Sequence, residues 1–196
     1  MGINLAKNQK ISLTKSDGQG LRQVFVGLGW DVVKKSGGFF GGLMGGGGGD
    51  IDLDASCLMF DANKNIVDAV WFRQLRSKDG SVIHSGDNLT GAGDGDDEVI
   101  TVDLTRVPAN VQSLVFVICS FRGQTFETVE SAFCRIVNKE SNTELGRYNL
   151  SAKNRYTAQV MAKVFRENGV WQVQTIGEPA NGSTYQELIP VAQRFL

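Results

Sequence analysis

The sequence predicts a mainly β protein, a two-sheet antiparallel β-sandwich with one or two short helices, including one at the C-terminus. Short runs of alternating apolar and polar residues recur along the chain, and Gly, Asn and Asp bound them. This spacing is typical of a sandwich or barrel rather than of a parallel sheet covered by helices. The 196 residues fit a single domain over 1–196.

The expected strands follow one another in chain order. They cover residues near 3–13, then 21–30, 51–60, 66–75, 98–104, 113–121, 132–138, 143–150, 157–166 and 170–177. Asn168-Gly169 separates the last two runs and favours a two-residue type I′ turn, because both central residues of that turn need positive φ. Residues 61–65 predict a similar hairpin turn.

Two helices are expected. One begins near Thr125 and places Phe126, Val129 and Phe133 on one side. The other covers residues 184–196, where Thr184 and Glu187 have the spacing of a capping box and Pro190 predicts a kink. The apolar face of this second helix is expected to pack on the sandwich, and it consists of Tyr185, Leu188, Ile189, Ala192 and Phe195.

Residues 36–49 form a glycine-rich insert, which we expect to be flexible because so dense a run of glycine cannot build a core.

Composition and charge exclude several classes. A net charge of -1 gives no reason to expect a nucleic-acid partner, which normally requires a clustered basic surface. The sequence predicts neither a signal peptide nor a transmembrane segment. Cys57, Cys119 and Cys134 lie singly in apolar runs, as buried thiols of a reducing compartment would. We therefore expect a cytoplasmic protein, with peripheral attachment to the inner membrane left open, and we interpret His84 as a polar loop residue.

Residues 86–98 are acidic and contain no basic residue. They carry Asp87, Asp94, Asp96, Asp97 and Glu98 among glycines and one asparagine. Two unit charges about 5 Å apart repel by roughly 3 kcal/mol at an effective dielectric near 20. If this segment folds compactly, it therefore needs a counter-ion.

A simple topology would bring further acids to this segment. If runs 21–30, 51–60, 66–75 and 98–104 form an up-and-down meander, Asp31, Asp50 and Glu98 meet at one end of the sandwich. Asp52 and Asp54 would join them on one strand face, because strand side chains repeat every two residues. Asp61 would lie at the opposite end.

The donor atoms favour calcium. They are carboxylates, the Asn88 amide and backbone carbonyls, and oxygen-only sites on loops suit Ca²⁺ better than Mg²⁺, zinc or copper. The segment is not an EF-hand, because Ala92 stands where the loop starting at Asp87 needs glycine.

Several motifs together resemble the TerD family of tellurite-resistance and stress-response proteins. They are GLGWD (27–31), DLDAS (52–56), SVIHSGDNLTGAGDGDDEVITVDL (81–104) and AFCRIVN (132–138). The glycine-rich insert and SFRGQTF (120–126) look most like the TerZ branch.

The resemblance implies a calcium-binding β-sandwich encoded among bacterial genes linked to tellurite, phage and colicin resistance. Carried onto matching positions, it implies that the calcium ligands come from Asp31, Asp52, Asp54, Asp87, Asn88, Asp94, Asp96, Asp97 and Glu98. The implied partners are calcium and other tellurite-resistance or membrane-associated proteins.

Three functional hypotheses remain. A calcium-binding interaction module in tellurite and chemical stress resistance is preferred over an enzyme. A metal-dependent phosphoryl-transfer enzyme would need a general acid or an anion-binding cation, and His84, Arg73, Arg76 and Lys78 are the nearby candidates. A small nucleotide-binding protein is the third hypothesis, since the family resembles slime-mould cyclic-AMP-binding proteins.

Overall fold

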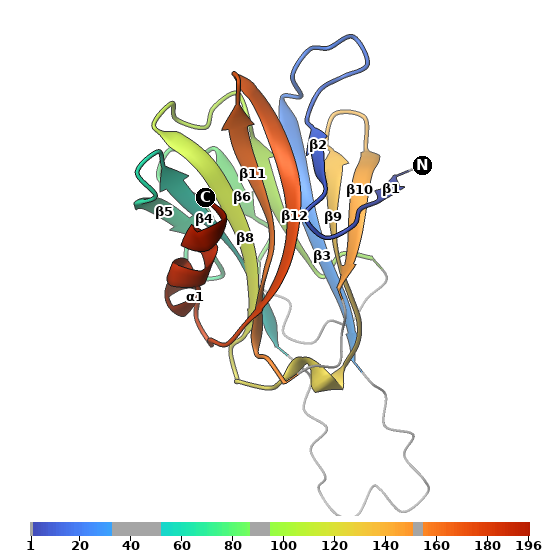
Figure 1. Ribbon diagram of the computed structural model, residues 1–196, viewed down its shortest axis with the longest axis vertical. Helices are drawn as coiled ribbons and strands as arrows, with labels where there is room; N and C mark the ends of the chain where they lie inside the picture. The colour runs from blue at the N-terminus through green and yellow to red at the C-terminus, as the bar shows by residue number, and fades with distance from the viewer. Residues whose placement is uncertain (1, 33–51, 87–94, 151–154) are drawn as a thin grey trace, which may run out of the picture.

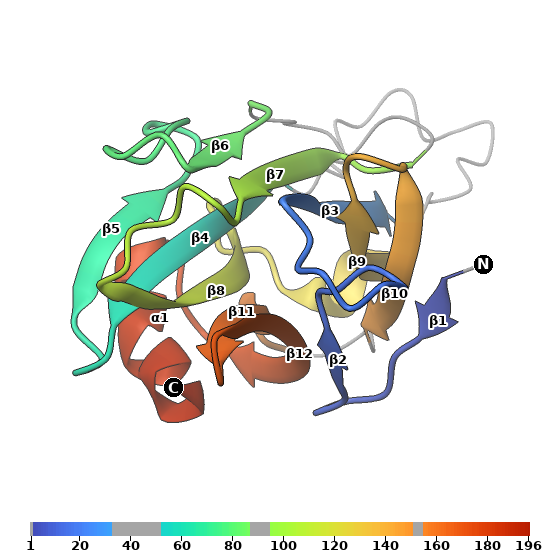
Figure 2. The same cartoon turned by 90° about the horizontal axis from the view of Figure 1, so that it is seen from above.

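The computed structural model describes residues 2–32, 52–86, 95–150 and 155–196. Within these ranges two six-stranded sheets face each other (Figures 1 and 2). The first sheet contains, in spatial order, β1 (Ile3–Asn4), β10 (Thr143–Leu150), β9 (Val129–Asn138), β3 (Gln23–Val32), β7 (Glu98–Asp103) and β6 (Val82–His84). The second contains β2 (Lys10–Ser12), β12 (Val170–Ala180), β11 (Ala158–Glu167), β8 (Val111–Ser120), β4 (Leu53–Asp61) and β5 (Ile66–Val70).

The predicted sandwich is confirmed. Among the pairs within the described ranges, every one is antiparallel except β1 with β10, which is parallel. The one α-helix of those ranges, α1 (Tyr185–Ala192), lies on the outer side of the second sheet beside β4, β8 and β11 (Figure 1).

Alternation along the strands builds the core between the sheets. On β3 the side chains of Val24, Val26 and Leu28 point inward and are at most 2% exposed. β4 is buried on both faces, because Leu53 and Met59 belong to this inner core while Phe60 packs beneath α1. A strand with two buried faces carries few polar side chains, so the polar residues that β4 does carry need a separate explanation.

The helix α1 closes a second, smaller core on the outer face of the second sheet. Leu188 and Ala192 are fully buried there, against Phe60, Val117 and Val160. The predicted apolar face of the C-terminal helix is therefore confirmed. The predicted capping box does not form, because Thr184 makes no side-chain cap bond and Glu187 Oε2 accepts from Ser183 N (2.8 Å), one residue before the N-cap.

The two predicted turns are confirmed. Asn168 and Gly169 have φ of 52° and 80°, the positive values that a type I′ turn requires. In the 61–65 turn, Asp61 Oδ1 accepts from the backbone N–H groups of Asn63 (2.9 Å) and Asn65 (2.8 Å).

The meander expected for the first four long runs is wrong. β3 pairs with β7 and β9 in the first sheet, whereas β4 pairs with β5 and β8 in the second. Twenty residues separate the end of β3 at Val32 from the start of β4 at Leu53. A connection of that length does not impose hairpin pairing, and the chain uses it to change sheets.

The helix expected near Thr125 is also wrong. Only Phe126–Thr128 form a short 3-10 turn, and β9 begins at Val129. β9 pairs with both β3 and β10, and this pairing overrides the local helical spacing. The run 66–75 is shorter than predicted as well, since β5 ends at Val70 and a turn follows.

The buried position predicted for the cysteines is confirmed, since Cys57, Cys119 and Cys134 are all buried free thiols. No helix within the described ranges is long and apolar enough to cross a bilayer. The insert 36–49 lies outside the described residues.

Candidate metal centre

The strand ends that carry the predicted ligands come together at one end of the sandwich. Asp31 is the second-last residue of β3, and Glu98 opens β7, where it pairs with Leu28 of β3. Asp97 N donates to Leu28 O (2.7 Å) and closes this corner of the first sheet. Asp52 directly precedes β4 in the facing sheet, and Asp54 is the second residue of that strand. Asp87, Asn88 and Asp94 lie outside the described residues.

Asp52 and Asp54 are buried carboxylates on the outer face of the second sheet. Each is 4% exposed, and their inward neighbour Leu53 belongs to the core between the sheets. The Asp54 side chain lines a pocket of about 10 Å³, which is close to the volume that one water molecule needs. Ser56, Ser183 and Thr184 also line this pocket, but most of its exposed wall is apolar and includes Trp71 and Phe121.

A cation of the protein lies beside Asp52. Arg122 Nε is 3.5 Å from Asp52 Oδ2, and the Arg122 side chain is 55% exposed. The backbone joins the same two segments, because Phe121 N donates to Asp52 O (3.3 Å). The loop after β8 is thus tied to the segment before β4.

Asp96 points away from Asp52 and Asp54. Arg135 on β9 donates Nε–H to Asp96 Oδ1 (2.7 Å) and an NH2 hydrogen to Asp96 Oδ2 (2.8 Å). This hydrogen bonding raises the pKa of Arg135. The Asp96 carboxylate lies over Gly27, on the outer face of the first sheet, where a side chain at residue 27 would occupy its space. The two groups of acids therefore face opposite sides of the sandwich.

Asp97 and Glu98 accept hydrogen bonds from backbone groups of both sheets. Asp97 Oδ2 accepts from Trp30 N (2.8 Å), next to Asp31. Glu98 Oε2 accepts from Ala55 N (2.7 Å) on β4, although the Glu98 side chain is fully buried. Glu98 thus joins the two sheets at the end where the ligands were predicted.

The sequence predicts that His84 is a polar loop residue, and this is wrong, because His84 is a buried residue of β6. Gly86 N donates to His84 Nδ1 (3.0 Å), so the ring proton is on Nε2 and is directed to Ala55 O (3.2 Å). His84 Nε2 is also 3.4 Å from Glu98 Oε2. The alternation of residues in SVIHS (81–85) could have predicted this burial, because Val82 and His84 are two positions apart and therefore share the buried face of the strand.

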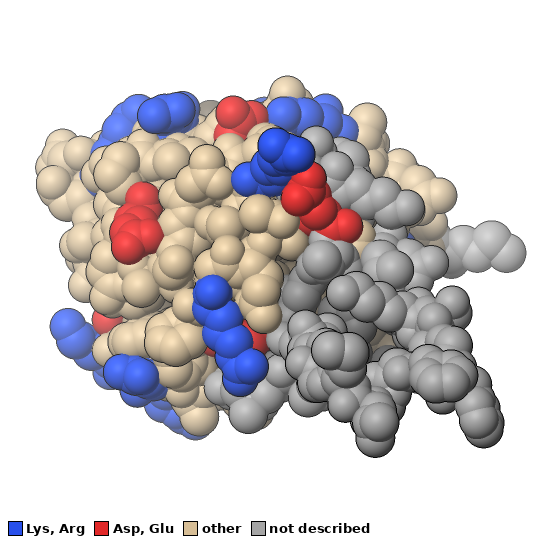
Figure 3. Space-filling model, turned by 90° about the horizontal axis from the view of Figure 1, so that it is seen from below, with Lys and Arg blue, Asp and Glu red and all other residues tan. Residues whose placement is uncertain are grey.

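The described residues do not by themselves form a metal site. Among them, no group of three or more His, Cys, Asp and Glu side chains is arranged to hold a metal ion. Figure 3 views this end of the molecule, where acidic side chains appear as small separate groups. The two buried carboxylates of Asp52 and Asp54 are oxygen donors of the kind that a hard cation needs.

Sequence reasoning missed Arg122 and Arg135, the two cations that meet the predicted acids. Both stand inside quoted motifs, at SFRGQTF and AFCRIVN, so the signal was present. Their partners could not be read from the motifs, because each pair joins segments from different parts of the chain.

The fold places this protein among the two-sheet β-sandwiches, with acidic residues near one end of the sheets. Comparison with known proteins identifies its family. The TerD domain matches residues 1–191, so the chain belongs to the TerD family.

Three known proteins illustrate the similarity. Tellurium resistance protein TerZ from Serratia marcescens is 48% identical over 95% of this chain and 94% of its own length. Stress response protein SCP2 from Bacillus subtilis is 42% identical over 96% of this chain and 98% of its own length. The crystal structure of a homologue of the telluride resistance protein TerD from Streptomyces coelicolor has a TM-score of 0.67 at 21% identity, covering 87% of this chain and 96% of that one. This last likeness concerns the fold alone.

Proposed function

We propose that this protein is a calcium-binding interaction module that acts in bacterial tellurite and chemical stress resistance. The ion would bind where β4 begins, with Asp52 and Asp54 as its ligands from the described residues. Asp31, Asp87, Asn88, Asp94 and Asp97 are the candidates to complete the site.

The burial of Asp52 and Asp54 is the observation that carries the proposal. Two carboxylates about 7 Å apart on one strand face repel by roughly 2 kcal/mol at an effective dielectric near 20. Burial adds a desolvation cost for each charge, which a bound cation would offset. The partly exposed guanidinium of Arg122 lies 3.5 Å from Asp52 Oδ2.

Asp96 and Glu98 have a different role in this proposal. Both Asp96 oxygens accept from Arg135, and Glu98 accepts from Ala55 N. These two residues would hold the start of β7 against β4 and β9 beside the calcium site. They become ligands only if the ion displaces these hydrogen bonds.

The stress role is supported by relatives. The similar proteins include TerZ and TerD, named for tellurium resistance, and general stress protein 16U of Bacillus subtilis, which is 44% identical over 93% of this chain. Survival of a tellurite-sensitive bacterium that expresses this chain tests the role. We expect protection by the wild type, and weaker protection by Asp54→Asn at equal protein level.

A calcium titration tests the binding. We expect heat in calorimetry and, at one hundred times Kd, a stabilisation of about 2.7 kcal/mol, which raises Tm by roughly 5–10 °C for a chain of this size. Asp52→Asn and Asp54→Asn should each weaken binding at least tenfold. Asp61→Asn is the matched control, because Asp61 ends β4 at the opposite end, roughly 25 Å away. An absence of heat and an unchanged melting curve would refute calcium binding, and equal losses in all three variants would refute its location.

A further inference from the structure

Exposed apolar side chains concentrate on one side of the molecule. Of the five large hydrophobic residues that are exposed within the described ranges, four lie on β5, on the loop after it, or on the neighbouring loop after β8. They are Ile66, Val67, Leu75 and Phe121, with 37–45% exposure. The fifth, Ile3, lies on β1 at the opposite lateral edge (Figure 1). Such a concentration marks an interaction site more often than single exposed residues do.

Aromatic rings join Phe121 to the loop after β5 and to α1. Trp71 packs edge-on against Tyr185 of α1 (5.2 Å between ring centroids) and against Phe72 (4.9 Å). Phe72 in turn packs edge-on against Phe121 (5.6 Å). The Arg73 guanidinium lies over the rings of Phe72 (5.2 Å) and Trp71 (6.0 Å). Arg73 therefore covers one face of Phe72 and of Trp71, and the Phe121 side chain remains 45% exposed.

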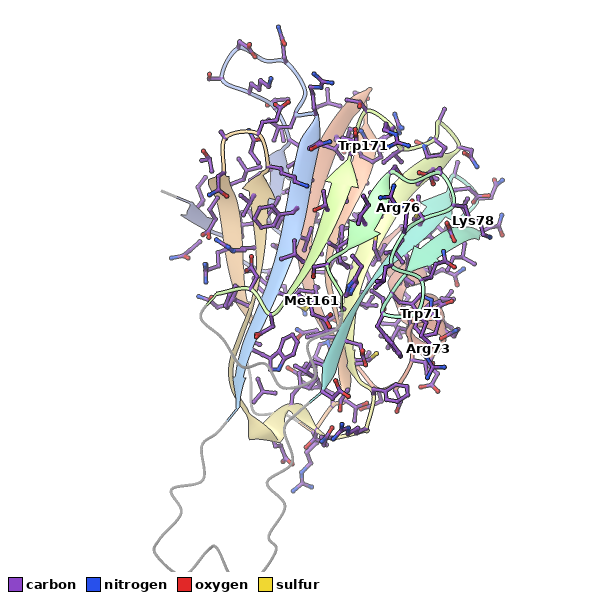
Figure 4. The ribbon with its side chains drawn as sticks, turned by 180° about the vertical axis from the view of Figure 1, so that it is seen from behind. Trp71, Arg73, Arg76, Lys78, Met161 and Trp171 are labelled. Carbon is purple, nitrogen blue, oxygen red and sulfur yellow. The ribbon has the colours of Figure 1, made fainter. Side chains whose placement is uncertain are left out.

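The same loop is positively charged. Arg73, Arg76 and Lys78 are exposed and, among the residues with described side chains, form no salt bridge. Figure 4 shows all three with Trp71 on the side formed by β5 and the loop before β6, and in Figure 3 basic side chains gather at the lower left, on the β5 side.

The nearby acids are turned inward. Asp68 Oδ2 accepts from Lys78 N (2.7 Å), and Asp79 Oδ1 accepts from Ser81 N (2.7 Å). The positive charge therefore faces outward.

We propose that this lateral surface, formed by Val67, Leu75, Phe121, Arg73, Arg76 and Lys78, docks on an anionic lipid bilayer. Aromatic edges and aliphatic tips enter the region between headgroups and acyl chains, and Arg and Lys contact the lipid phosphates. Each cation near an anionic bilayer contributes about 1 kcal/mol, which is roughly a fivefold change in binding.

Other occupants fit the surface less well. Single-stranded nucleic acid binds by stacking bases on open ring faces, and here the Arg73 guanidinium lies over the rings of Phe72 and Trp71. An added peptide strand would need the outer edge of β5. Gln74 Nε2 and Lys78 N both bond Asp68 of β5, which ties the 74–78 segment across that edge.

The test is co-sedimentation of the full chain with sucrose-loaded vesicles in low salt and EDTA, so that calcium binding plays no part in the result. We expect binding to vesicles of phosphatidylglycerol mixed with phosphatidylcholine, at least tenfold above binding to phosphatidylcholine alone. Arg73→Gln with Lys78→Gln should lower binding by roughly 25-fold, fivefold for each cation. Leu75→Ser with Phe121→Ser should lower it at least fivefold.

Matched controls keep the result specific. Ile3→Ser and Lys139→Gln replace exposed residues of the same kinds on the first sheet, and both should bind like the wild type. Circular dichroism confirms that each variant is folded. The proposal is overturned if anionic vesicles are not preferred, or if the control variants lose as much binding as the surface variants. It is also overturned if polyglutamate or oligo-dT, and not vesicles, binds through these residues.

Discussion

Replacing Asp96 by asparagine separates the structural role of this acid from calcium binding. The substitution keeps the side-chain shape over Gly27 and removes the charge that meets Arg135 in two hydrogen bonds of 2.7 and 2.8 Å. A hydrogen bond to a charged group contributes about 1.5–3 kcal/mol. Three features reduce the loss: Arg135 is 28% exposed, Glu144 Oε2 remains 3.4 Å away, and asparagine still offers one acceptor. We therefore expect Asp96→Asn to lower the free energy of unfolding by about 2 kcal/mol.

Urea unfolding in EDTA, followed by circular dichroism, measures this loss without any contribution from calcium. On heating, the same change lowers Tm by roughly 4–8 °C for a chain of this length. Glu127→Gln is the matched control, because it breaks the Arg155–Glu127 pair, whose side chains are 89% and 47% exposed. That pair should contribute about 0–1 kcal/mol. A loss below about 0.5 kcal/mol for Asp96→Asn, or one equal to the control, would refute the structural role of the Asp96–Arg135 pair.

Two further predictions concern ionisation. The hydrogen bond from Arg147 lowers the pKa of Glu144 below its ordinary value of 4.5. The ionised Glu144 side chain therefore makes its full contribution to stability above pH 4.5, and that contribution is lost as the pH falls through the lower folded-state pKa. Glu144→Gln should therefore destabilise the protein more near neutrality than well below pH 4.5, and a pH-independent difference in urea unfolding would contradict this. Burial raises the pKa of Cys119 and of Cys134 to about 12 and also raises that of Cys57. Ellman's reagent should react slowly with the native protein. In concentrated guanidinium chloride it should react with all three thiols. Rapid labelling of the native chain would show that the thiols are accessible and would contradict this prediction.

The sequence by itself determined the local features of this protein. The period-two runs identified most of the long strands, and Asn168-Gly169 specified a type I′ turn. The spacing of Leu188 and Ala192 identified the buried face of α1. These features depend on residues close together in the chain, so alternation, turn chemistry and helical spacing suffice to predict them. The same holds for the family, because its motifs are contiguous.

Only the tertiary structure decided which segments face one another. β3 and β4 follow each other among the long strands yet lie in different sheets, and Phe126 sits in a 3-10 turn before a strand. Asp96 and Asp54 belong to neighbouring segments but point to opposite outer faces. Asp54 follows the pleat of β4, whereas Asp96 lies just before β7, where it is held over Gly27 by Arg135. The partners of Asp96 and Glu98, which are Arg135 and Ala55, come from strands that adjoin them only after the sheets assemble. Pairing of this kind depends on the packing of the whole sandwich, and residue spacing along one segment does not encode it.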